Sequence, residues 1–318
     1  MEMRTLGSTG LRVSRIGFGV LTMGATQLDL DLDAGAELIR YAMDQGINFF
    51  DTAQYYRTYP YLRRALAGRQ DELVLCSKCL SGSYEAMREA VEEARIQMDR
   101  DVIEIFLLHE VRHNGDLESR AGALEYLMEA KQKGLVKAIG LSTHHADVAM
   151  AAAVHEDFDV LFPLINFKGL GIRYGAGPGT REQMEQAIRV AAESGKGTFA
   201  MKVFGGGNLT GYYQEALDYV SALPGIDSLM IGFGHRQEID EILAYEAGTL
   251  KVDFKPQLSH KKMRIDQGDC ESCGACLLRC PNGAIGWTAQ GTASIDQSVC
   301  LNCGYCAPHC PVRAIIML

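Results

Sequence analysis

The sequence predicts an α/β protein in which a (β/α)₈ TIM barrel is followed by a small C-terminal domain. Three observations support this fold class. Strand-like and helix-like segments alternate eight times between residues 16 and 246, which is the number and period of a closed barrel. The chain has 318 residues, whereas such a barrel needs roughly 250. Eight of the ten cysteines lie after residue 269, so the remainder is expected to form a separate cysteine-rich unit.

Each predicted strand is a short apolar run, and each predicted helix carries apolar residues three and four positions apart. Asp33 is expected to cap the first helix and Ser83 the third. A doubly wound open sheet is the main alternative, but eight successive units favour closure. The predicted strands are 16–19, 47–50, 73–76, 102–108, 137–141, 160–165, 198–202 and 228–231, and the predicted helices are 33–44, 61–66, 83–98, 119–133, 146–154, 180–193, 212–222 and 237–246.

The ends of the chain complete this organisation. Residues 3–6 and 11–14 flank a Gly-Ser-Thr-Gly turn, which predicts a hairpin that closes the bottom of the barrel. The barrel is expected to cover residues 1–250. A polar segment at 251–262 that contains Pro256 is the expected linker. The small domain, with α+β structure, is expected to cover 263–318.

The cysteines of the small domain form two copies of one pattern, C-x₂-C-x₂-C-x₃-C-P. The first copy is Cys270, Cys273, Cys276 and Cys280, and the second is Cys300, Cys303, Cys306 and Cys310. This run is typical of bacterial ferredoxins with two [4Fe–4S] clusters, in which the fourth cysteine of each copy ligates the other cluster. Zinc sites use a different spacing, and disulfides need a secretory route. The pattern therefore predicts a ferredoxin-like domain that carries single electrons.

The two ligand sets follow from this exchange of the fourth cysteine. Cys270, Cys273, Cys276 and Cys310 are predicted to hold one cluster, and Cys300, Cys303, Cys306 and Cys280 the other.

The composition of the chain also restricts what kind of protein it can be. Hydrophobic residues make up 47% of the chain and charged residues 22%, which suits a large globular core. The net charge of −9 argues against a nucleic-acid partner. No apolar run reaches the roughly 20 residues that span a bilayer, and the first residues have no apolar signal-peptide core. We therefore expect no membrane contact and a cytoplasmic location.

Polar residues follow several predicted strands directly, and in a (β/α)₈ barrel such positions meet at the catalytic mouth. Lys78 closes an apolar strand, and His109 follows the run Ile-Phe-Leu-Leu. A structural ion pair and a core histidine are the alternative readings of these two residues. The full set of strand-end residues is Asp51, Lys78, His109, Ser142, Asn166 and Lys202.

Together these residues resemble the motifs of the aldo-keto reductase family. The resemblance rests on Asn-Phe-Phe-Asp-Thr-Ala-Gln-Tyr-Tyr at 48–56, Ser-Lys at 77–78, Leu-Leu-His at 107–109, Gly-Leu-Ser at 140–142 and Ala-Met-Lys at 200–202. It covers roughly residues 1–250, and its motifs occur in the family's order. It implies NAD(P)H-dependent reduction of a small carbonyl substrate.

The resemblance assigns a catalytic tetrad to Asp51, Tyr56, Lys78 and His109. Tyr56 would donate a proton to the developing alkoxide, Lys78 held by Asp51 would lower the pKa of that tyrosine, and His109 would orient the carbonyl. The family has a glycine after its tyrosine, whereas Arg57 stands here, and Tyr55 is a competing donor.

The resemblance also implies contacts to the nucleotide. Ser142 and Asn166 would hold the nicotinamide amide, and Gly205 and Gly206, with Gly207, would cradle the pyrophosphate. The remaining expected contacts are Thr143, which replaces the usual asparagine, Lys202, and Arg236 at the adenosine end.

The two halves of the chain move electrons differently. A nicotinamide gives a hydride, whereas an iron–sulfur cluster passes one electron at a time. A bound flavin could connect the two, because flavins accept pairs and release single electrons. The predicted function is therefore an iron–sulfur oxidoreductase that reduces a carbonyl or related substrate with NAD(P)H, with electrons from two clusters, or with both. The alternative is an electron-transfer protein that serves a redox partner and uses the barrel as a scaffold.

Overall fold

The computed structural model describes residues 1–318 except 26, 70, 258–260 and 302–303. Eight parallel strands close into a barrel in chain order, which confirms the predicted fold class. The strands are β3 (Ile16–Gly19), β4 (Phe49–Asp51), β5 (Val74–Cys79), β6 (Ile103–Leu108), β7 (Val136–Thr143), β8 (Val160–Pro163), β11 (Gly197–Ala200) and β12 (Ser228–Ile231). Nearly every residue of these strands is buried, because one face fills the barrel and the other meets the helices.

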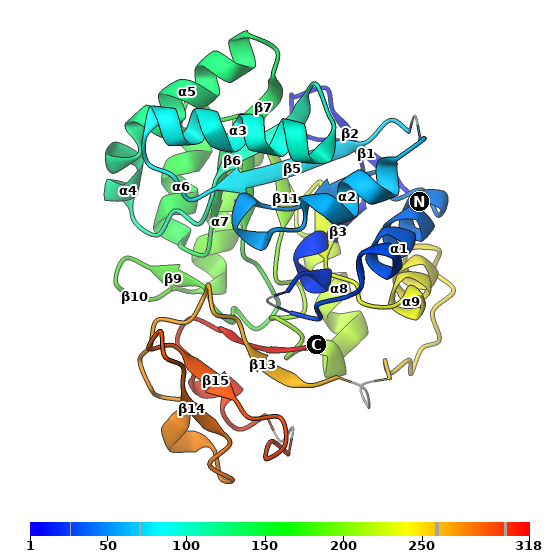
Figure 1. The fold of residues 1–318 in the computed structure, drawn as a ribbon, viewed down its shortest axis with the longest axis vertical. Coiled ribbons are helices and arrows are strands. Elements are labelled where there is room, and N and C mark those ends of the chain that lie inside the picture. The colour runs from blue at the N-terminus through cyan, green and yellow to red at the C-terminus, as the bar shows by residue number, and fades with distance from the viewer. Residues whose placement is uncertain (26, 70, 258–260, 302–303) are drawn as a thin grey trace.

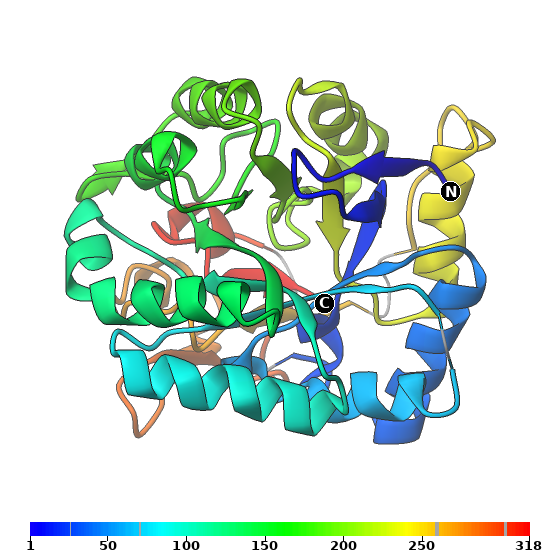
Figure 2. The ribbon, with the colours of Figure 1, turned by 90° about the horizontal axis from the view of Figure 1, so that it is seen from above.

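Helices surround the strands, as Figure 2 shows from above. They are α1 (Leu32–Asp44), α2 (Tyr59–Leu66), α3 (Tyr84–Met98), α4 (Asn114–Ser119), α5 (Ala121–Gln132), α6 (Ala146–Val154), α7 (Arg181–Glu193), α8 (Tyr213–Ala222) and α9 (Arg236–Glu246). Within the described parts of the chain, no helix is long and apolar enough to span a membrane.

The helix caps confirm one prediction and correct another. Ser83 caps α3, since its hydroxyl accepts a hydrogen bond from the Ala86 amide at 3.3 Å. The cap of α1 is Asp31 and not Asp33: the Asp31 carboxylate accepts from the Asp33 amide at 2.9 Å. Asp31 stands outside the helical turn with an extended ψ of 143°, whereas Asp33 already belongs to the first turn.

The predicted hairpin closes the bottom of the barrel. Strand β1 (Met3–Thr5) pairs antiparallel with β2 (Arg12–Ser14). Leu6 and Val13 from this hairpin join Phe49, Phe162 and Phe199 in the apolar core inside the barrel. The rings of Phe162 and Phe199 stack with their centres 4.3 Å apart. The interior of the barrel is therefore packed from below.

The small domain contains two antiparallel sheets of two strands each. β13 (Met263–Ile265) pairs with β16 (Ile315–Met317), and β14 (Ile285–Trp287) pairs with β15 (Ala293–Ile295). In Figure 1 this domain lies against one end of the barrel, with β13 and β16 near the barrel and β14 on the far side. A short hairpin, β9 (Arg173–Tyr174) with β10 (Gly177–Pro178), occupies the glycine-rich loop before α7.

Candidate active site and cluster-binding domain

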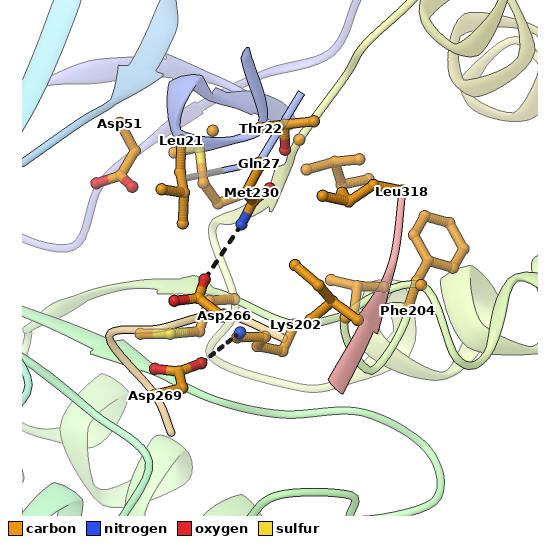
Figure 3. Close-up of a pocket in the computed structure, with 18 of the residues that line it drawn as sticks. Leu21, Thr22, Gln27, Asp51, Lys202, Phe204, Met230, Asp266, Asp269 and Leu318 are labelled. Atoms are coloured by element: carbon orange, nitrogen blue, oxygen red, sulfur yellow. Dashed lines mark hydrogen bonds and ion pairs between the residues drawn. The ribbon is translucent and has the colours of Figure 1, made fainter. Parts of the chain in front are cut away.

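A cavity of about 800 Å³ lies at the carboxyl ends of the barrel strands, between the barrel and the small domain. Figure 3 shows residues of both domains around it: Asp51, Lys202 and Met230 come from the barrel, and Asp266 and Asp269 from the small domain. Because the two domains share its walls, this cavity belongs to neither alone.

The four residues of the predicted tetrad all line this cavity. Asp51 ends β4, Lys78 lies in β5, His109 follows β6, and Tyr56 belongs to the short 3-10 helix η2 (Gln54–Tyr56). The Lys78 ammonium donates to the Asp51 carboxylate at 2.6 Å and to the Thr52 carbonyl at 2.7 Å. The Tyr56 hydroxyl is hydrogen-bonded to His109 Nε2 at 3.2 Å.

Tyr56 rather than Tyr55 stands beside the other members of this group. The Lys78 ammonium lies 4.9 Å from the centre of the Tyr56 ring, and that ring meets His109 edge to face. Tyr55 also lines the cavity, but 44% of its surface is exposed. The chemistry that this arrangement permits is proton donation from Tyr56 to an oxygen that His109 orients.

Burial dominates the electrostatics of the group. It raises the pKa of the Tyr56 phenol well above its usual range, and the carboxylates Asp51 and Asp269 add to that effect. The net shift of this pKa is upward, and the lowering effect expected from Lys78 stays a prediction, since that ammonium is also engaged by Asp51 and Thr52. Burial, followed by the nearby Lys78 charge, also lowers the pKa of His109 well below its usual range. His109 is thus a neutral imidazole at pH 7.

The predicted nucleotide contacts do not all reach the cavity. Ser142, Thr143, Lys202 and Gly206 line it, whereas Gly205 does not. Asn166 is completely buried. Its side chain donates to the Leu170 carbonyl and accepts from the Leu170 amide, both at 2.9 Å. Arg236 lies over the Tyr41 ring and near Glu37, at 3.7 Å, on the outside of the barrel.

The cavity also contains residues that were absent from the expectations for the site, among them Asp269, Asp266 and Gln27. Asp269 Oδ2 accepts from the Lys202 ammonium at 3.0 Å, and Asp266 Oδ2 accepts from the Gln27 amide at 3.3 Å. Burial is the largest effect and opposes charge on both Lys202 and Asp269. Their attraction to each other and to neighbouring groups together outweighs it, so the pKa of Lys202 is raised and that of Asp269 lowered. The only sequence signal was the position of Asp269 directly before Cys270.

The cysteine side chains of the small domain fit [4Fe–4S] clusters. Cys276 is close enough to Cys310, Cys270 and Cys273 for their charges to raise its pKa, after the larger effect of burial. Cys306 is affected in the same way by Cys280 and Cys300, and its pKa rises to about 11. Cys303 lies outside the described residues.

Local backbone geometry supports the same fit. The Ala284 and Ala314 amides donate to the Cys280 and Cys310 sulfurs at 3.2 Å, the type of hydrogen bond that tunes iron–sulfur clusters. Gly274 and Gly304, inside the two ligand loops, have φ of 72° and 76°, a conformation that side chains disfavour.

The fold and the cavity define an oxidoreductase barrel that is joined to an iron–sulfur domain. The sequence profile of the aldo/keto reductase family matches residues 15–225, and that of the 4Fe-4S dicluster domain matches residues 269–314. The chain therefore belongs to the aldo/keto reductase family. The second match supports the binding of [4Fe–4S] clusters by the small domain.

Individual relatives agree with this assignment. L-galactose dehydrogenase of Arabidopsis thaliana is 27% identical over 160 residues, which are 46% of this chain and 50% of the relative. Aldo-keto reductase YhdN of Bacillus subtilis is 28% identical over 158 residues, or 45% and 47% of the two chains. The chain thus spans about half the length of these curated relatives. A solved structure assigned to the aldo-keto reductases, from Pseudomonas aeruginosa, is 26% identical with a TM-score of 0.66, covering 78% of this chain and 96% of its own.

Proposed function

We propose that this chain reduces a small carbonyl or related compound at the tetrad, with electrons that enter through the iron–sulfur domain. One observation carries the proposal. The segment 266–269, which leads directly into the cluster ligand Cys270, forms a wall of the cavity that holds the tetrad. The iron–sulfur domain therefore borders the cavity. Nicotinamide nucleotides, NADPH or NADH, are the reductants that the family implies.

The residues of the barrel bind and protonate the substrate. Tyr56 holds its proton, because burial raises the pKa of the phenol, so it donates rather than accepts a hydrogen bond at the substrate oxygen. His109 lies 3.2 Å from the Tyr56 hydroxyl and is neutral, which lets it orient the same oxygen without adding a charge. Lys78 and Asp51, with side chains 1% and 7% exposed, fix the floor of the site.

Bound clusters would supply single electrons at the cavity wall. The balance of the reaction is simple: one carbonyl takes up two electrons and two protons and becomes an alcohol. Each electron comes from a low-potential one-electron donor outside this chain. One proton comes from Tyr56, which solvent reprotonates, and the second comes from solvent.

Anaerobic mixing tests the proposal. Protein with intact clusters is reduced with limiting dithionite and mixed with a panel of aldehydes and ketones, and cluster absorbance and alcohol are measured. We expect a substrate that reoxidises the clusters with one alcohol formed per two electrons. Tyr56→Phe should slow this reaction at least about 100-fold, the lower end of general acid catalysis, whereas the matched control Tyr55→Phe should not. Equal rates in Tyr56→Phe and the parent protein would remove Tyr56 from the mechanism.

A second function is favoured by the exposed surface of the small domain. Leu301 and Tyr305, in the ligand loop of the second cluster, are 68% and 65% exposed, as expected where a redox protein partner docks. In this function the chain is an electron-transfer protein, and a flavin at the barrel mouth would connect it to two-electron chemistry. The absorbance of the supernatant after denaturation shows whether flavin is bound, and unchanged activity of Tyr56→Phe in every assay would favour this function.

A further inference from the structure

The groups that a nicotinamide nucleotide needs are engaged by the chain itself when the two domains are packed together. We propose that this closed arrangement excludes NADH and NADPH and leaves the cavity to the substrate alone. This exclusion depends on the proposed function in one respect: the electrons then enter through the iron–sulfur domain and not from a bound nucleotide. The contacts that carry it lie at the phosphate end and at the amide end of the expected nucleotide site.

At the phosphate end, the small domain covers the glycine-rich loop. In (β/α)₈ barrels phosphates bind at the loops after strands seven and eight, which are β11 and β12 here. The Gly206 carbonyl accepts from the Met317 amide of β16 at 2.8 Å. A Cβ on Gly207 would lie 2.2 Å from the Met317 carbonyl oxygen, and one on Gly206 would lie 2.7 Å from the Ile316 side chain. Because these glycines have no side chain, strand β16 can pack directly against them. It occupies the position that the family resemblance assigns to the pyrophosphate.

The loop is also tied to β16 through a side chain. Asn208 Nδ2 donates to the Ile315 carbonyl at 2.8 Å and to the Gly205 carbonyl at the same distance. A nucleotide that needed this loop would have to break the contact with β16 before its pyrophosphate could take the place of the strand.

The loop after strand eight is filled by a carboxylate of the chain. The first amides of a helix are a natural anion site, and at α9 the Gly234 and His235 amides donate to Glu238 at 2.7 and 3.2 Å. Glu238 is also paired with Lys261. A phosphate at this position would have to displace a buried carboxylate that already has its hydrogen bonds and its cation.

The cations expected near the nucleotide also have acidic partners. Lys202 pairs with Asp269, and their side chains are only 19% and 17% exposed. Arg236 lies near Glu37 on the outer surface. A dinucleotide would bring its negative charges to residues whose charges are already balanced, so the gain in electrostatic energy would be small.

At the amide end, the expected partners of the nicotinamide are occupied as well. Both polar atoms of the Asn166 side chain bond to Leu170. Ser142 Oγ accepts from the Glu110 amide at 2.9 Å. Thr143 Oγ1 donates to the Val111 carbonyl at 2.6 Å and accepts from the His145 amide at 2.9 Å. The carboxamide of a nicotinamide could therefore not bind the Asn166 side chain, which is buried and hydrogen-bonded to Leu170.

Direct binding measurements test this inference. Anaerobic protein with intact clusters is titrated with NADH and with NADPH up to about 1 mM, the upper end of common KM values, and nicotinamide fluorescence is followed. An aldo-keto reductase that consists of the barrel alone is the positive control. We expect saturable binding in the control and none in this protein, with cluster absorbance bleached by dithionite but unchanged by either nucleotide. Iron and sulfide analysis of the same sample verifies that the domain is folded.

The two proposals fail in different ways. Saturable binding of either nucleotide by the protein would overturn the exclusion, even if a carbonyl still reoxidises the reduced clusters. No carbonyl-dependent reoxidation, together with no nucleotide binding, would overturn the proposed function and support the exclusion.

Discussion

The ion pair between Lys202 and Asp269 offers the sharpest test of how the two domains are held together. Both side chains are more than four-fifths buried, and their charged atoms are 3.0 Å apart. Lys202→Met leaves the Asp269 carboxylate buried without its cation, and breaking a buried pair in this way costs about 3 kcal/mol. Since each 1.4 kcal/mol is a factor of about ten, the fraction of molecules with separated domains should rise about 100-fold.

Hydrogen exchange measures this opening, because the Met317 amide, which donates to the Gly206 carbonyl at 2.8 Å, becomes free to exchange with solvent when the domains part. Its exchange rate reports the open population. The double variant Lys202→Met with Asp269→Asn is the matched control, because it removes both charges and should recover much of the loss. If the Met317 amide exchanges no faster in Lys202→Met than in the parent protein, the ion pair does not hold the domains together and the reasoning fails.

Three further predictions concern the tyrosine, the loop and the cysteines. Because the pKa of Tyr56 lies above its usual value of about 10, the phenol stays protonated as pH rises, and the pH–rate profile should show no basic limb between pH 7 and about 10. Gly207→Ala should move β16 and speed exchange of the Met317 amide, whereas Gly211→Ala, with open space around its Cβ, should not; equal exchange rates would contradict this. Cys276→Ser should lower bound iron from about eight to about four atoms per chain, while Cys79→Ser, outside the cluster domain, should keep the full content.

Much of the barrel and of the tetrad followed from the sequence, for one physical reason. Parallel strands that alternate with helices bring all their carboxyl ends to one mouth. A polar residue at the end of a strand, such as Lys78 or His109, is therefore placed by local sequence alone. The cysteine spacing is equally local, because one tight loop supplies three ligands of a cluster. Domain boundaries at 250 and 263 stay predictions.

Other features depend on contacts that local sequence does not encode. Asp31 and Asp33 are both good caps, and only the backbone conformation selects between them. Asn166 ends its strand as expected, yet the following loop folds back so that Leu170 takes both of its polar atoms. The raised pKa of Tyr56 comes from burial and from carboxylates that include Asp269, which is more than 200 residues away in the chain.

The covalent link between the domains explains why so few contacts can keep the cavity closed. A short linker gives the tethered domain an effective concentration in the millimolar range, so docking needs little more than about 4 kcal/mol of contact energy to dominate. The bonds of Gly206 and Asn208 to β16 and the pair of Lys202 with Asp269 are contacts of that scale. The same contacts occupy the loop where a dinucleotide would bind. Separation of the domains would therefore free this loop, whereas the contacts of Asn166, Ser142 and Thr143 lie within the barrel and would remain. A variant that weakens closure should relieve the exclusion at the phosphate end.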